Sequence, residues 1–218
     1  MNKKQASLIA RVSDGDGLYY FLQLRDNKKS APFQFPGVFS LFGGAVEDGE
    51  QPISSFFREM AEELGGLDPR GINTQHRLYR WRQDLDSVEA RINDVLCNNF
   101  NVCRGFDYNS PVPDEALGKD RGKKLTYREF ITSVDEDHFY VAEFTAEQIR
   151  RLIIKEGRKG VLMPAEICSN LILYPTDKLA LMHDYAITLT SKLPGDFGIN
   201  GHCSDPADLA GAGSGICR

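Results

Sequence analysis

The sequence has 218 residues, of which 41% are hydrophobic and 26% charged, and these fractions are ordinary for a globular protein. The formal net charge of -5 disfavours sequence-independent binding to nucleic acids and anionic membranes. Residues 1–12 hold no apolar stretch of signal-peptide length, and no window approaches the roughly 18 apolar residues of a membrane span, so a cytoplasmic protein is expected. Its five scattered cysteines favour free thiols over a disulfide framework or a zinc site.

Strand-like segments, enriched in β-branched and aromatic residues, alternate irregularly with helical ones along the chain. Strands are predicted over residues 7–12, 18–24, 39–42, 76–82, 127–134 and 138–144. The first two and the last two are expected to form hairpins, and Gly43-Gly44 is expected to end the third strand. Helices are predicted from Pro52 to before Gly65, over 87–96, after the capping-box pattern Thr145 to Gln148, and over 177–193.

This mixture predicts an α/β protein whose mixed sheet is covered by helices on both faces. One domain is expected over residues 1–194, with an irregular insertion around 86–124. Residues 195–218 are rich in glycine, alanine and small polar residues, which is typical of a low-complexity tail.

The segment from Gly44 to Gly66 carries the chemistry. On a helical wheel of about 100° per residue, its apolar side chains form one stripe. Those side chains are Ile53, Phe56, Phe57, Met60, Ala61 and Leu64. Glu59, Glu62 and Glu63 fall on a separate arc, where three carboxylates a helical turn apart repel one another. Hard divalent cations such as Mg²⁺ or Mn²⁺ prefer oxygen ligands, so a metal site is predicted there.

Arg58 lies four residues before Glu62 and eight after the loop residue Glu50. A bidentate bond from its guanidinium group would fix the orientation of a carboxylate beside the metal. The alternative is a surface ion pair that contributes less than about 1 kcal/mol.

These residues resemble the signature of the Nudix hydrolases, G-x5-E-x7-R-E-U-x-E-E-x-G-U, where U is a bulky aliphatic residue. The matching residues are Gly44, Glu50, Arg58, Glu59, Met60, Glu62, Glu63 and Gly65. Gly66 stands where the family has an aliphatic residue, and Leu67 is expected to supply the missing packing. The alternative is an ordinary amphipathic helix with a charged outer face.

The resemblance implies a Nudix-type α/β/α sandwich with a mixed sheet. It also implies that Glu59, Glu62, Glu63 and the carbonyl of Gly44 bind Mg²⁺ or Mn²⁺, with Glu50 and Arg58 as the supporting pair. A later loop that contains Glu156 resembles the one that supplies a further ligand or base in many members. Glu136, Glu143 and a simple solvent-facing role for Glu156 stay open as alternatives.

The resemblance further implies hydrolysis of a phosphoanhydride bond in a small nucleotide substrate. ADP-ribose or a nucleotide sugar is favoured over oxidised nucleoside triphosphates. The aromatic residues Phe33, Phe35 and Phe39 are candidates to stack on a base, although aromatics beside strands more often fill the core. Basic residues within 119–128 are candidates for a lid, and a homodimer stays open. The alternative function is a Nudix domain that binds nucleotides without cleaving them.

Overall fold

The computed structural model describes residues 4–15, 17–25, 38–102, 107–117, 122–156 and 159–191. Its main sheet has seven strands. They are β1 (Lys4–Asp14), β2 (Gly17–Leu24), β3 (Phe39–Ser40), β4 (Phe42–Ala45), β6 (Gln75–Tyr79), β7 (Glu136–Phe144) and β9 (Lys159–Pro164). The strands β5 (Leu64–Gly65) and β8 (Ile153–Ile154) form a separate pair.

The sheet is mixed, because β1 and β7 run parallel while the other strand pairs are antiparallel. Its order is β3-β2-β1-β7-β6, with β4 added beside β1 and β9 beside β2. The helices are α1 (Pro52–Glu63), α2 (Trp81–Ile92), α3 (Tyr127–Ile131), α4 (Ala146–Arg150) and α5 (Pro175–Ser191). Shorter helical turns are η1 (Pro69–Gly71), η3 (Asp114–Ala116) and η5 (Ala165–Asn170), and η2 (Asn93–Asn99) is a π-helix.

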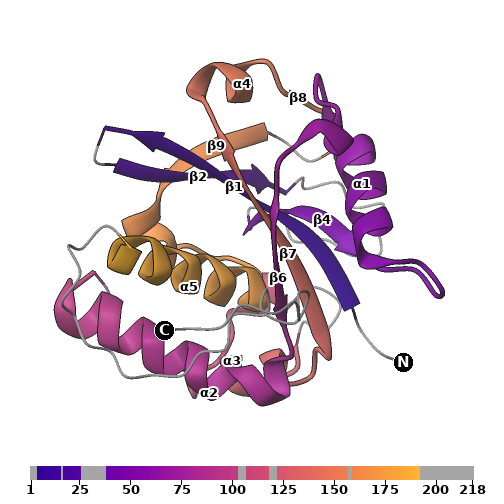
Figure 1. Cartoon of the computed structure of the whole chain (residues 1–218). Helices are drawn as coiled ribbons and strands as arrows, with labels where there is room; N and C mark the ends of the chain where they lie inside the picture. The colour runs from indigo at the N-terminus through magenta and orange to yellow at the C-terminus, as the bar shows by residue number, and fades with distance from the viewer. Residues whose placement is uncertain are drawn as a thin grey trace, which may run out of the picture.

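Helices cover both faces of the sheet, with α1 on one side and α2 and α5 on the other (Figure 1). Alternate residues of β1 serve the two layers, since Leu8 packs in the core under α1 and Ile9 in the core under α5. This period of two is what a strand buried on both faces requires. The predicted α/β/α sandwich with a mixed sheet is therefore confirmed.

The first hairpin is confirmed and is tighter than predicted. Asp14 pairs with Gly17, so the two strands approach each other more closely in sequence than residues 12 and 18 suggested. Gly15 has a φ of 57°, a left-handed conformation that glycine adopts without steric cost. Gly43 and Gly44 lie within β4 rather than ending a strand, because they pair with Ser7 and Ala6 of β1.

The predicted strand over 127–134 is wrong, because Tyr127–Ile131 forms α3. The side chain of Thr126 accepts a hydrogen bond from the Glu129 N–H, and the Glu129 carboxylate accepts one from the Thr126 N–H. This reciprocal capping box stabilises the start of a helix. The same arrangement of Thr145 and Gln148 begins α4, where a helix was predicted.

The predicted strand over 76–82 ends at Tyr79, and the helix that follows begins at Trp81, earlier than predicted. Within the proposed insertion 86–124, the described residues contribute Val88, Ile92, Tyr108 and Val112 to the core under α5. Among the basic residues of the suggested lid, Arg128 forms ion pairs with α2. Residues 118–121 and the tail lie outside the described part of the chain.

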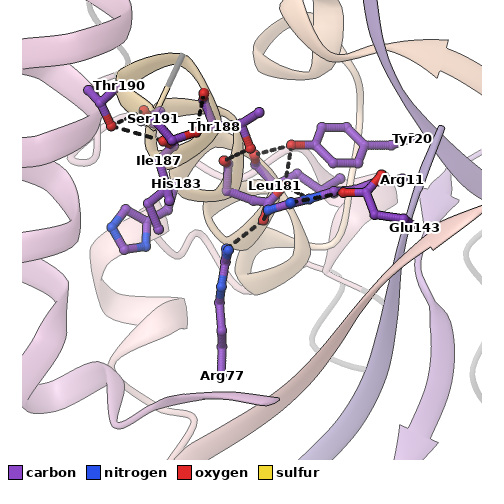
Figure 2. A network of polar contacts seen from close by, with 12 residues as sticks. Arg11, Tyr20, Arg77, Glu143, Leu181, His183, Ile187, Thr188, Thr190 and Ser191 are labelled. Carbon is purple, nitrogen blue, oxygen red and sulfur yellow. Dashed lines mark hydrogen bonds and ion pairs between the residues drawn. The ribbon is translucent and has the colours of Figure 1, made fainter. Parts of the chain in front are cut away.

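The buried carboxylate of Asp184 ties α5 to the sheet. It accepts hydrogen bonds from Nε of Arg11 at 2.9 Å and from the hydroxyl of Tyr20 at 2.6 Å, and it forms an ion pair with Arg77. Arg11, Tyr20 and Arg77 reach α5 from three different strands (Figure 2). A buried charge requires such partners, so this network fixes where α5 lies on the sheet.

The expectation of free thiols is wrong for Cys97, which is disulfide-bonded, while Cys168 is a buried free thiol. Over the ranges that the structure describes, no helix is both long enough and apolar enough to cross a membrane.

Candidate metal and phosphate site

Helix α1 is held against the sheet by Phe56 and Met60, which are fully buried. Pro52 occupies the first turn, where its missing N–H costs nothing. The hydroxyl of Ser55 donates to the carbonyl of Ala45 at 3.1 Å and fixes the helix to the end of β4. This docking turns the last residue of the helix, Glu63, toward the sheet.

The three glutamates of α1 differ in their surroundings. The side chains of Glu63, Glu59 and Glu62 are 4%, 15% and 54% exposed. The predicted apolar stripe also differs, because Ile53 is exposed and Ser55 is buried in its place. The exposure of the carboxylates therefore increases from Glu63, in the protein interior, to Glu62, at the solvent-facing surface.

Glu63 contacts the strand that opens the signature. Its Oε2 accepts a hydrogen bond from the Gly43 N–H at 2.7 Å, and its Oε1 lies 3.6 Å from the guanidinium group of Arg25. Burial raises the pKa of Glu63 to about 8, and the nearby charges of Glu59 and Glu156 add to this rise. Because burial and the neighbouring charges disfavour the ionised form of Glu63, a cation bound beside it would stabilise that form.

Glu59 lies directly against Gly44. A Cβ atom at Gly44 would lie 2.4 Å from the carboxyl carbon of Glu59, so only glycine leaves room for this carboxylate. Burial raises the pKa of Glu59; Arg58, whose Nη1 donates to Glu59 at 2.6 Å, opposes this rise, while Glu62 and Glu156 add to it.

Arg58 forms hydrogen bonds with the loop that precedes α1 and with the end of β4. Its Nε and Nη2 donate to the two carboxylate oxygens of Glu50 at 3.2 and 3.1 Å, which is the bidentate geometry expected for a supporting pair. Its Nη2 also donates to the carbonyl of Ala45 at 3.1 Å. The hydrogen bond from Arg58 lowers the pKa of Glu50. These contacts hold Glu59 in place beside Gly44.

The loop with Glu156 is anchored to the end of α1. The backbone N–H of Lys155 donates to the carbonyl of Glu63 at 2.8 Å, and its Nζ donates to the carbonyl of Ala61 at 2.6 Å. The amide of Gln23 donates to the carbonyl of Glu156 at 2.9 Å. Of the three candidates for the further acidic residue, Glu156 is the one whose charge acts on both Glu59 and Glu63.

A close approach of the backbone at Arg151 explains the glycine at position 66. Gly66 has a φ of 76°, and a Cβ there would lie 2.5 Å from the carbonyl oxygen of Arg151. An aliphatic residue therefore does not fit, and Leu67 packs against the core under α1, as expected.

The other two candidates for the further acidic residue belong to different surroundings. Glu136 forms an ion pair with Lys4 at 2.7 Å, and Glu143 forms one with Arg11 at 3.1 Å. Glu143 and Arg11 line a cavity of about 640 Å³ beside η1 and the end of β7. No residue of the predicted metal site lines this cavity.

The chemistry of the acidic cluster fits a hard divalent cation. Its donors are all oxygens. Burial raises the pKa values of both Glu59 and Glu63, and negative neighbours add to the rise, so a cation would relieve the repulsion between the carboxylates. In the described ranges, no three acidic, histidine or cysteine side chains are already arranged to hold an ion together. Glu62 is the most exposed of the three glutamates, and its Oε2 lies 3.5 Å from Nη1 of Arg58, so a bound ion would compete with this ion pair.

Sequence reasoning missed Gly43, Gln23 and Arg25 as neighbours of the acidic cluster. Gln23 accepts a hydrogen bond from Arg25 at 2.8 Å while it binds the Glu156 carbonyl. Gln23 lies near the end of β2, and Arg25 follows that strand directly. The contact of Gln23 with Glu156 and that of Arg25 with Glu63 depend on how distant segments pack together. Phe39 is partly buried against the core under α5, whereas Phe33 and Phe35 lie outside the described residues.

No protein-family model matches the chain. It is 36% identical over 62 residues to the nucleoside triphosphatase NudI of Salmonella arizonae, and the same match is found in Salmonella paratyphi B. The match covers 28% of this chain and 41% of that relative, so the chain spans about two fifths of the curated relatives' length.

In structure, the chain is similar to a mutT/nudix family protein from Listeria innocua, with a TM-score of 0.50 and 13% identity over 87% of this chain and 95% of the other. It also matches the NUDIX domain of Shewanella oneidensis NrtR, complexed with ADP ribose, with a TM-score of 0.47 and 12% identity over 86% of this chain and 89% of that one. The chain therefore shares the fold of this mutT/nudix family protein, and its Gly44–Gly66 segment resembles the Nudix signature.

Replacement of Gly44 by alanine tests the contact with Glu59. The new Cβ overlaps the end of a flexible side chain, so Glu59 moves while the fold persists. We expect kcat/KM to fall about 10- to 100-fold, as misplaced catalytic groups do. Gly71→Ala is the matched control, because its Cβ would meet nothing closer than 3.6 Å. Equal kcat/KM values in steady-state assays of both variants would contradict the contact.

Proposed function

We propose that this protein is a Mg²⁺- or Mn²⁺-dependent hydrolase of phosphoanhydride bonds in nucleotides. One observation carries the proposal: Glu59 and Glu63 meet at Gly43 and Gly44, within reach of the charge of Glu156. The helix carboxylates of this acidic cluster come from the segment that resembles the Nudix signature. Two guanidinium groups lie beside the cluster, because Arg58 donates to Glu59 at 2.6 Å and Arg25 lies 3.6 Å from Glu63.

Each residue then has a part in the reaction. Glu59, Glu62, Glu63 and Glu156, with the carbonyl of Gly44, hold the ion. When bound, the ion neutralises phosphate charge and makes the attacking water more acidic. Arg58 and Glu50 keep Glu59 oriented, and Arg25 offers a positive charge to the phosphate oxygens. Glu156 is also the candidate base for the attacking water.

For the substrate, we favour a nucleoside diphosphate linked to another moiety, such as ADP-ribose or a nucleotide sugar. Nucleoside triphosphates are the next candidates, because the matched relatives are named nucleoside triphosphatases. The net charge of -5 argues against nucleic acid as a substrate.

A substrate panel tests the function. Purified protein is incubated with Mg²⁺ or Mn²⁺ and with ADP-ribose, nucleotide sugars and nucleoside triphosphates. Phosphate released by added alkaline phosphatase then reports cleavage. We expect turnover of at least one substrate that requires the metal. Binding without turnover across the panel would favour the alternative, a Nudix domain that senses nucleotides.

The raised pKa of Glu63 makes metal binding dependent on pH. At pH values below its pKa of about 8, this carboxyl group carries a proton in the ion-free protein, and Mn²⁺ must displace it. The apparent Mn²⁺ affinity is therefore expected to rise as the pH increases from about 6 to about 8. Isothermal titration calorimetry at several pH values measures this slope. A Glu63→Gln variant with the same slope would contradict the assignment.

A further inference from the structure

Helix α5 reaches across the core to the strand that carries the signature glycines. Asp177, in the first turn of α5, is 5% exposed, and its Oδ2 accepts a hydrogen bond from the backbone N–H of Leu41 at 3.0 Å. Leu41 is itself buried and lies between β3 and β4. A buried N–H needs a partner, so Asp177 fixes the backbone at this point.

Only one residue, Phe42, separates Leu41 from Gly43 of the site. Phe42 is fully buried, and the next residue, Gly43, donates its N–H to Glu63 at 2.7 Å. The backbone at Gly43 has little freedom, because its φ is 145° and a Cβ would lie 2.3 Å from the carbonyl oxygen of Ala6. A shift at Leu41 therefore moves the Gly43 N–H and the neighbouring Gly44.

The surroundings of Asp177 connect it to the same cluster. Burial raises the pKa of Asp177 to about 7, the buried carboxylate of Asp137 adds to this rise, and Arg25 opposes it. Arg25 is also the cation beside Glu63. Asp137 has its own partner, because its Oδ2 accepts a hydrogen bond from Nε1 of Trp81 at 2.7 Å.

We propose that Asp177 is a positioning residue for the acidic cluster. Through the Leu41 N–H, it sets where β4 presents Gly43 to Glu63 and Gly44 to Glu59. It touches neither metal nor substrate. Its effect on catalysis rests on the proposed hydrolase function, whereas its effect on the geometry of Gly43 does not.

The test compares variants that differ in the acceptor at position 177. Asp177→Ala removes the acceptor of the Leu41 N–H. Asp177→Ser removes it with a smaller change in polarity, because the serine hydroxyl is too short to reach that N–H. Asp177→Asn keeps an oxygen of the same reach. Val88→Ala, on the buried face of α2, serves as the control for general destabilisation.

In Asp177→Ala and Asp177→Ser, we expect amide exchange of Leu41 and Gly43 to be about tenfold faster than in Val88→Ala. We expect kcat to fall about 10- to 100-fold with KM within about threefold of wild type, because geometry rather than binding is lost. Asp177→Asn should keep both quantities within about threefold of wild type.

Unchanged Gly43 exchange in both acceptor-removing variants would overturn the proposal. An Asp177→Asn variant as impaired as Asp177→Ala would also overturn it, because charge rather than the acceptor would then matter. If no substrate is cleaved by the wild-type protein, the hydrolase function fails, and the exchange of the Gly43 amide still decides the role of Asp177.

Discussion

Replacement of Glu63 by glutamine is expected to lower kcat about a thousandfold, because the proposed metal ligand loses its charge. The fold should survive, since the glutamine carbonyl oxygen can still accept the Gly43 N–H that Glu63 binds at 2.7 Å. Glu62→Gln is expected to lower kcat as well. Steady-state kinetics with saturating Mg²⁺, and circular dichroism to check the fold, measure the effect.

The matched control is Glu147→Gln on α4. Glu147 forms an exposed ion pair with Arg151, and pairs of this kind contribute little to stability. Its kcat should equal that of the wild type. Near-normal turnover in both Glu62→Gln and Glu63→Gln would refute the metal-ligand assignment.

Replacement of Asp184 by alanine is expected to lower the free energy of unfolding by about 3–5 kcal/mol. The change leaves Arg77 without its buried partner and Tyr20 without its acceptor at 2.6 Å. Arg11 keeps only the ion pair with Glu143. Urea denaturation monitored by tryptophan fluorescence measures the loss, since Trp81 is the only tryptophan in the chain.

Asp86→Ala offers the comparison for this prediction. Asp86 forms an ion pair of the same type with Arg128 at 2.8 Å, but its side chain is 85% exposed. Its loss should cost less than about 1 kcal/mol, because water replaces the partner. Equal losses in the two variants would show that the burial of Asp184 contributes nothing.

The sequence predicted α1 and its carboxylates well because their information is local. Pro52 opens the helix, the apolar stripe docks it, and the spacing of Glu59, Glu62 and Glu63 follows from the helical period. The contact of Arg58 with Glu50 could also be anticipated, since the signature fixes their separation.

The errors have physical causes as well. Tyr127–Ile131 is rich in residues that favour strands, yet the Thr126 and Glu129 capping box makes it helical. The same pattern at Thr145 correctly predicts the start of α4, whereas at Thr126 the strand-favouring composition of the following residues conceals it.

Contacts between distant segments could not be predicted. Gly43 binds Glu63 because β4 pairs with β1 in one register, and Asp177 reaches Leu41 because α5 packs against that sheet. The difference in burial among the three glutamates likewise depends on how α1 docks. Such contacts depend on tertiary packing, which a single sequence does not encode in any short pattern.

Anomalous X-ray diffraction from a crystal soaked in Mn²⁺ tests the central claim most directly. We predict an anomalous peak within coordinating distance of the carboxylate oxygens of Glu59 and Glu63, with a further ligand from Glu62 or Glu156. Two results together would contradict the metal site and the function built on it. The map would show no peak at these carboxylates, and the same protein in solution with Mn²⁺ would cleave no nucleotide.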